Sequence, residues 1–227
     1  KVNFNMELSI DTSTRYASVA ISEEGQLMHY HTWKSQRNHS VELVPSIIKL
    51  LESHHLTVED LDAIFVAKGP GAFSALRVGM STSKTLSFGL NIPIVGIPTT
   101  EIEIHPFIHN HEEIIALIPA GRNRVYVAQY SGAILSSPIV VLSLEDFIEN
   151  IQDHAFYCGE GVSQILEQKE IIVKFKHSEI EIPSRKPEIL CRLGYEKVKM
   201  NEVDDLALLE PMYITSTQIN SANNKNL

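Results

Sequence analysis

The strongest structural signal in this chain is the stretch Phe65-Val-Ala-Lys-Gly-Pro-Gly-Ala-Phe-Ser-Ala-Leu-Arg-Val-Gly79. It predicts a buried strand over 62–67, a turn at Gly69-Pro70-Gly71 and a helix that runs to about Phe88. Glycines let the backbone come close to a ligand, and the first N–H groups of a helix carry the positive end of its dipole. Gly69 and Gly71 are therefore candidate phosphate-binding residues. A plain tight turn explains them equally, because no Lys-Ser/Thr pair follows as in a Walker A loop.

The helix after this turn has two different faces at about 100° per residue. One face carries small side chains suited to close backbone packing, and the other carries two cations on an apolar stripe. The stripe suits an anionic ligand or the carboxylates of a partner, and a solvated face is the alternative. The small face contains Ala75, Gly79, Thr82, Ser83 and Leu86, and the stripe contains Phe73, Arg77, Met80 and Lys84.

Composition limits the function classes. The 227 residues, 44% of them hydrophobic, fit one large domain or two lobes. Lys and Arg number 19 against 28 Asp and Glu, a net charge of −9, so the chain is not expected to hold nucleic acid unaided. Cys158 and Cys191 are too few for a disulfide framework or a zinc cluster. No membrane helix or signal peptide is evident, so we expect a cytoplasmic protein.

Residues 6–97 have the element order of one lobe of the acetate kinase, sugar kinase, Hsp70 and actin superfamily, which they resemble. In that superfamily an Asp-x-Gly-Thr turn after the first strand holds nucleotide phosphate or its metal. Here the turn is Asp11-Thr12-Ser13-Thr14, and the Cβ of Ser13 intrudes where glycine is usual. The expected elements are strands over 6–10, 16–21, 26–33, 62–67 and 92–96 and two helices. One helix covers 41–53 with Ser40 as N-cap, and the other runs from directly after the Gly71 turn to about Phe88.

The helix over 41–53 carries more apolar surface than one core requires. Its apolar residues spread over roughly 180°, whereas a helix on a single core needs somewhat over about 100°. The excess predicts a partner surface, and a helix sandwiched within its own fold is the alternative. The apolar residues are Val41, Leu43, Val44, Ile47, Ile48, Leu50 and Leu51.

The second half predicts a smaller second lobe over 101–214. It begins with a linker over 101–113 that is rich in Glu and His, and its last helix can pack back on the first lobe. The polar residues 215–227 predict a disordered tail. The expected elements are strands over 114–119, 124–130, 139–142, 155–158 and 171–175 and helices over 144–151, capped by Ser143, 162–168 and 187–200.

Together these residues resemble the TsaB (YeaZ) family. The family supplies the small partner subunit in bacterial threonylcarbamoyladenosine modification of tRNA. The resemblance implies a two-lobed actin-like α/β fold and pairing with the catalytic subunit TsaD, which binds ATP and a metal. The matching segments are 8–14, 16–20, 38–45, 60–64, 69–79, 93–96, 124–126 and 210–213.

The same resemblance implies that no metal site is present. The metal-binding His-x-x-x-His of TsaD falls on Thr99 and Glu103, and a threonine cannot replace an imidazole. A rival metal segment, His105 to His111, has imidazoles four residues apart. It contains Pro106 and lacks an evident third ligand, so a solvated loop is the alternative.

The function implied by the resemblance is that of a pseudo-enzyme without catalytic residues. It would activate TsaD for threonylcarbamoyl transfer to ANN-decoding tRNAs, with tRNA bound only through the complex. A TsaE-like ATPase is a further expected partner, and the chain alone is expected to form a homodimer and to bind no cofactor, with ATP or ADP possible at the joint surface. His39 and Leu76 join the two helix surfaces in the expected interface.

Two enzyme classes remain as alternatives. One is an ATP-dependent small-molecule kinase or ATPase that uses Asp11 and the Gly69 turn. The other is a metal-dependent, glycoprotease-like peptidase. No Ser-His-Asp, G-x-S-x-G or Cys-His arrangement supports peptidase chemistry.

Overall fold

The structure is a computed structural model that describes residues 6–167, 175–178 and 182–214. It forms two compact units, of which the first contains residues up to Thr99 together with 186–212. The second contains the described residues of 100–185 and 213–214. The expected boundary therefore differs, because the last helix belongs to the first unit. The expected tail over 215–227 and most of the expected strand over 171–175 lie outside the described residues.

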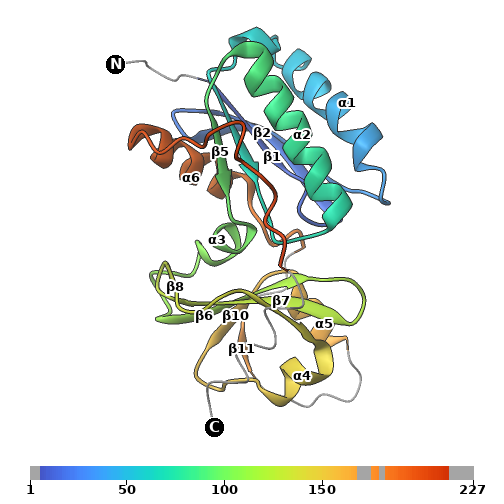
Figure 1. The fold of residues 1–227 in the computed structure, drawn as a ribbon, viewed down its shortest axis with the longest axis vertical. Helices are drawn as coiled ribbons and strands as arrows, with labels where there is room; N and C mark the ends of the chain where they lie inside the picture. The colour runs from blue at the N-terminus through green and yellow to red at the C-terminus, as the bar shows by residue number, and fades with distance from the viewer. Residues whose placement is uncertain (1–5, 168–174, 179–181, 215–227) are drawn as a thin grey trace. The chain divides into compact units, whose positions relative to one another are not determined.

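The first unit is built on a five-stranded sheet in the order β3-β2-β1-β4-β5 (Figure 1). β1, β4 and β5 are parallel, and β2 and β3 complete the sheet as antiparallel strands. β1 and β4 are buried along their whole length, as expected for strands covered on both faces. The strands are β1 (Glu7–Asp11), β2 (Tyr16–Glu23), β3 (Gln26–Lys34), β4 (Ala63–Ala67) and β5 (Ile94–Ile97).

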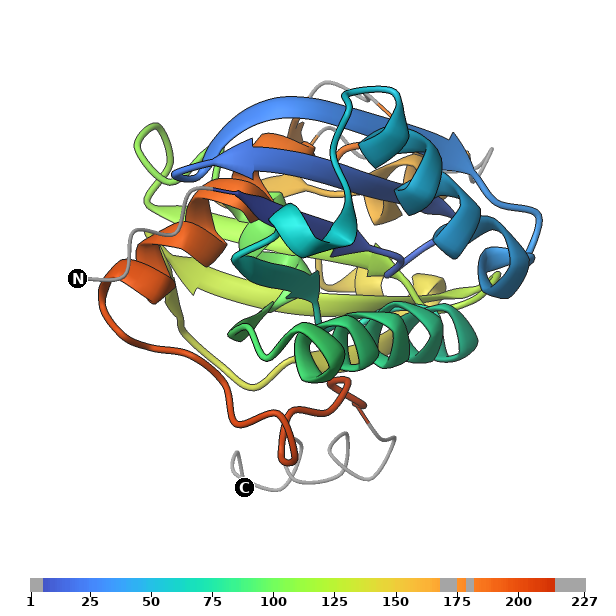
Figure 2. The same cartoon turned by 90° about the horizontal axis from the view of Figure 1, so that it is seen from above.

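Two helices cover one face of this sheet and a third covers the other (Figures 1 and 2). Leu8 and Ile10 of β1 pack in one cluster with the buried side of α1 (His39–Glu52). α2 (Phe73–Leu90) follows the Gly69 turn and packs beside α1. The alternate residues of β1 point to the opposite face of the sheet, which α6 (Pro187–Lys199) covers. There the Ser9 hydroxyl donates to Sγ of Cys191 in α6, at 3.3 Å. A short 3-10 helix, η1 (Val58–Asp60), precedes β4.

The second unit has a six-stranded sheet with the path β11-β10-β6-β7-β8, and β9 also pairs with β7. The ring of Tyr157 contacts Phe147 and Phe175 edge-on in its core. No helix in the described part of the chain is long and apolar enough to cross a membrane. The elements are β6 (Glu113–Pro119), β7 (Arg124–Ser131), β8 (Ile134–Leu135), β9 (Val140–Ser143), β10 (Phe156–Cys158), β11 (Lys176–His177), α3 (Thr99–Ile104), α4 (Leu144–Glu149) and α5 (Gly161–Leu166).

Two local expectations are wrong. α1 starts two residues earlier than expected, at His39, with Asn38 rather than Ser40 as N-cap. The loop before it is held by the side chain of Ser35, which accepts from the Asn38 N–H at 3.0 Å. The segment over 101–113 is not simply a linker, since α3 occupies its start and buries Glu103. The Ser143 cap is confirmed, because its hydroxyl accepts from the Asp146 N–H at 3.0 Å.

Glu7 is a buried carboxylate on the α6 side of the first sheet. Its Oε2 accepts from the Ser22 hydroxyl at 2.5 Å and from the Gly25 N–H at 3.2 Å. Its Oε1 has no hydrogen-bond partner among the described residues. Burial therefore raises the pKa of Glu7 from 4.5 to about 7, against the opposing effect of the Ser22 hydrogen bond.

This pKa predicts a pH-dependent stability. The folded chain binds a proton on Glu7 more tightly than the unfolded chain, so the contribution of Glu7 to stability is fully present below pH 4.5 and is lost as the pH rises through 7. Glu7→Gln should remove up to about 3 kcal/mol of this dependence. Urea unfolding at pH 5 and pH 8 measures it, with exposed Glu23→Gln as the control. A Glu7→Gln variant with the wild-type pH slope would contradict the assignment.

Candidate functional site

The two loops predicted to bind phosphate lie directly against each other in the first unit. The N–H of Ala72, at the start of α2, donates to the carbonyl oxygen of Ser13 at 2.7 Å. A Cβ added at Gly71 would overlap that same oxygen. Glycine at this position is therefore required by the packing of the two loops, without a ligand.

The polar groups of the first loop are hydrogen-bonded within the protein. Oδ1 of Asp11 accepts from both the N–H and the hydroxyl of Ser13. The Thr12 hydroxyl donates to the Ala75 carbonyl at 2.7 Å, and a Cβ at Gly79 would overlap this hydroxyl. Asp11, Thr12 and Ser13 are all buried. The small-residue face of α2 therefore packs directly against this loop, which confirms the close packing expected of that face.

The Gly69 turn is covered by the end of the first unit. Gly69 has a φ of +102°, which favours glycine, and an added Cβ would lie 3.0 Å from the carbonyl oxygen of Met212. The Met212 N–H donates to the Lys68 carbonyl at 2.6 Å, and the Gly69 carbonyl accepts from the Thr99 N–H at 2.8 Å. The structure brings the five predicted cofactor residues to one edge of the sheet and gives each a structural role. Nucleotide binding by them stays a prediction.

The loop contact can be tested with two glycines near or within α2. Gly71→Ala should destabilise the first unit by about 3 kcal/mol, because the new methyl group meets a backbone carbonyl that is itself hydrogen-bonded. Gly89→Ala is the control, since a Cβ there has no heavy atom within 4 Å. It should stabilise by about 0.5 kcal/mol. Urea unfolding compares the two, and equal stabilities would contradict the packing.

The apolar residues of α1 divide into a buried and an exposed group. Leu43, Ile47, Leu50 and Leu51 are at most 6% exposed and form the core against β1 and β2, so their assignment to a partner interface is wrong. Val41, Val44 and Ile48 are 68%, 46% and 46% exposed and follow one line along the helix. The sequence periodicity gave the width of the apolar arc on α1. It did not show which part of that arc the sheet covers.

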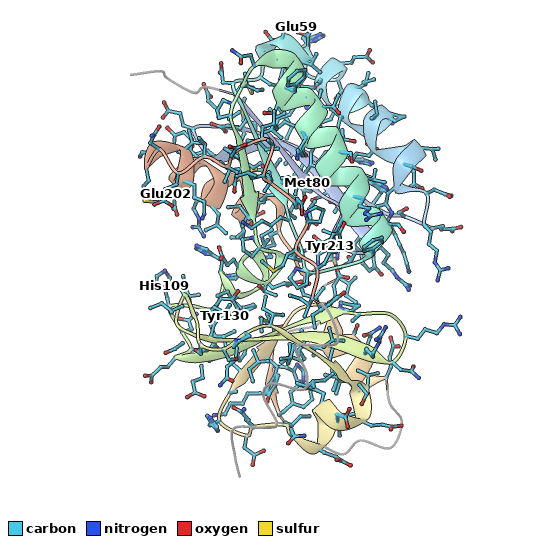
Figure 3. All side chains as sticks on the ribbon, viewed as in Figure 1. Glu59, Met80, His109, Tyr130, Glu202 and Tyr213 are labelled. Atoms are coloured by element: carbon cyan, nitrogen blue, oxygen red, sulfur yellow. The ribbon has the colours of Figure 1, made fainter. Side chains whose placement is uncertain are left out.

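Several other interface assignments are corrected in the same way. His39 is buried with its Nε2 3.0 Å from the Thr14 carbonyl oxygen, and Leu76 and Met80 are buried under α2. Figure 3 labels Met80 on this helix. Lys84 donates to the Leu209 carbonyl at 2.9 Å. These side chains stabilise the unit itself.

Phe73 and Arg77 remain at the surface of α2. Phe73 is 51% exposed, and the Arg77 guanidinium lies 4.0 Å from the centre of its ring. α1 and α2 pack side by side, so these two residues and the exposed line on α1 belong to neighbouring helices. We call Val41, Val44, Ile48, Phe73 and Arg77 the exposed helix strip.

Glu103 takes part in a buried ion-pair network of the second unit. Nη1 of Arg185 lies 3.0 Å from Oε1 of Glu103 and 2.9 Å from Oε1 of Glu160, and the Ser184 hydroxyl donates to Glu103 at 2.7 Å. Burial raises the pKa of Glu103 to about 7, although the Arg185 charge opposes this shift. Sequence reasoning missed Arg185, because no local pattern relates it to α3.

The described residues contain no group of three or more His, Cys, Asp or Glu side chains arranged to hold a metal ion. The helical spacing proposed for His105 and His109 is wrong, because residues 105–110 form turns after α3. His109 lies at the surface (Figure 3). His111 instead stacks on the Phe156 ring with 3.7 Å between ring centres.

Comparison with known proteins identifies the family. A family model described as TsaD, tRNA N6-adenosine threonylcarbamoyltransferase, matches residues 33–141. The tRNA threonylcarbamoyladenosine biosynthesis protein TsaB of Haemophilus influenzae is 33% identical over 169 residues, which cover 68% of this chain and 71% of that protein. The chain belongs to the TsaB family. A TsaB protein of Bacillus subtilis is 31% identical over 150 residues, 64% of this chain and 66% of its own length.

A solved TsaB-family structure confirms the fold. YeaZ from Pseudomonas aeruginosa matches with a TM-score of 0.70 at 23% identity, covering 92% of this chain and all of that chain. The predicted two-lobed actin-like α/β architecture is therefore correct for this TsaB-family chain.

Proposed function

We propose that this chain is a non-catalytic TsaB subunit that binds and activates a TsaD-like catalytic subunit. The complex would transfer a threonylcarbamoyl group to the adenosine beside the anticodon of ANN-decoding tRNAs, in the cytoplasm. The exposed helix strip carries this proposal, because a line of branched apolar side chains and an aromatic ring on neighbouring helices suits burial by another protein. Family membership supplies the reaction.

The closed loops support a non-catalytic role. A kinase or ATPase of this fold would need polar side chains and N–H groups free to meet phosphate. Here Asp11 accepts from Ser13, and the first N–H groups of α2 include Ala72, which is bonded to the Ser13 carbonyl. The chain alone would therefore bind no nucleotide, and ATP or ADP would bind only at a surface completed by TsaD. A TsaE-like ATPase would join this complex.

The strip would also support self-association. In the absence of TsaD the same apolar side chains would face water, and a second copy of the chain offers an identical surface. A homodimer that uses the strip would then compete with the TsaD complex. Both associations should fail together when the strip is changed.

Aspartate substitutions on α1 test the interface. Ile48→Asp should abolish the homodimer and the TsaD complex, because it places a charge in the exposed apolar line that the partner would bury. The unfolding free energy should fall by less than about 1 kcal/mol, since Ile48 is 46% exposed in the chain alone. tRNA modification by the reconstituted complex should fall at least about tenfold. Light scattering, a pull-down and the modification assay measure these effects.

Two variants serve as controls. Val203 lies outside the strip and is 44% exposed, which is close to the exposure of Val44 and Ile48. Val203→Asp should therefore leave association intact. Leu50→Asp changes a core residue of the same helix and should unfold the first unit. Normal association of the Ile48→Asp variant would refute the strip as the interface. A folded Ile48→Asp complex that binds TsaD and loses modification would instead refute the proposed route of activation.

A further inference from the structure

The charges of residues 6–99 are separated between the two ends of the first sheet. β1, β4 and β5 all end at one edge, where β3 also ends and α1 and α2 begin. The connections at this edge, 12–15, 35–38 and 68–72, contain no aspartate or glutamate. Two carboxylates flank them: Asp11 is buried at the end of β1, and Glu42 in the first turn of α1 accepts from Nε1 of Trp33 at 3.0 Å. Three exposed cations that lie outside the exposed helix strip are in or beside these connections, namely Arg15, Lys34 and Arg37. We call these three residues the basic edge.

The opposite end of the sheet is acidic. It contains the turn between β2 and β3, the end of α1 and the segment that leads into β4. The acidic side chains there include Glu23, Glu24, Glu52, Glu59, Asp60 and Asp62. In a chain with a net charge of −9, the basic edge is therefore a local exception produced by the fold.

Backbone contacts hold the basic edge together. The Ser35 N–H donates to the Arg15 carbonyl at 2.7 Å, which joins the connection that carries Arg37 to the loop after β1. The neighbouring Thr14 carbonyl meets His39 at the start of α1, and Ser13 bonds to Ala72 before α2. Arg15 and Arg37 thus lie in connections that are fixed to one another, and Lys34 ends the neighbouring strand β3.

One of these cations lies near an aromatic ring. Nζ of Lys34 is 5.5 Å from the centre of the Tyr16 ring. A cation beside an aromatic face suits the phosphates and bases of a nucleic acid. Guanidinium groups also bind phosphate oxygens through paired hydrogen bonds.

We infer that the basic edge binds the phosphate backbone of the tRNA substrate when the chain is part of the modification complex. This inference rests on the proposed function, because the RNA is the substrate of that complex. It differs from the expectation that the chain meets tRNA only through its partner. The acidic remainder of the chain would keep its affinity for RNA low when it is alone.

The test removes two cations that lie outside the exposed helix strip. The complex of chain and TsaD is prepared with the wild type, with Arg15→Gln/Arg37→Gln, and with Lys49→Gln/Lys199→Gln as a control of equal charge. Lys49 and Lys199 are exposed and lie outside the basic edge. Binding of fluorescent tRNA is measured by anisotropy from about 50 to 300 mM KCl, and TsaD association is measured on the same samples.

The basic edge predicts a specific result. The arginine variant should lower the slope of log affinity against log salt by about 1.5 to 2 and weaken binding about tenfold at 100 mM KCl, as the loss of two phosphate contacts requires. The lysine control should match the wild type, and both variants should still bind TsaD. If only TsaD association is lost, the edge meets an acidic protein surface and the inference is wrong. Unchanged tRNA binding refutes it as well.

The inference can be separated from the proposed function. If the wild-type chain does not associate with TsaD, the proposed function fails, and the same variants are compared on the chain alone at about 20 mM KCl, where phosphate contacts are strongest. Weaker tRNA binding by the arginine variant than by the lysine control then supports the basic edge. Equal binding by the two variants overturns it.

Discussion

The hydrogen bond from the Ala72 N–H to the Ser13 carbonyl fixes the first unit at its most important point. It ties the start of α2 to the loop after β1, and it does so at a distance that only a glycine at position 71 allows. Once α2 starts there, Gly79 packs against Thr12 of the loop after β1. Phe73 and Arg77 are left at the surface, whereas Met80 on the same side of the helix is buried.

This constraint also positions the surfaces proposed for binding. α1 begins where His39 meets Thr14, one residue beyond the Ser13 contact, so both helices start from the same loop. The exposed residues of the two helices therefore belong to elements that start at the same edge of the sheet, where Arg15 and Arg37 also lie. The residues that hold nucleotide phosphate in related enzymes would here serve as the structural support for a protein and RNA interface.

The sequence predicted the first unit well because its signals are local. Residues 62–88 alone contain the patterns of a buried strand, a glycine turn and a helix with one face of small residues. The order of these elements was sufficient to predict the fold of the first unit. The sequence could not predict which side of α1 the sheet covers, because this depends on which strands lie against Leu43 and Leu50. The return of the last helix to the first unit was among the sequence expectations, but its contact with Ser9 through Cys191 was not. That contact and the Arg185 ion pairs join segments far apart in the chain, and no periodic pattern predicts them.

The central claim is that the phosphate loops are closed by their own contacts. Titration of the isolated chain with ATP and Mg²⁺ in a calorimeter tests this most directly, together with an assay for released phosphate. The account predicts no binding tighter than about 1 mM, which corresponds to roughly −4 kcal/mol, and no turnover. Binding of one ATP per chain in the micromolar range, with turnover by the chain alone, would contradict it.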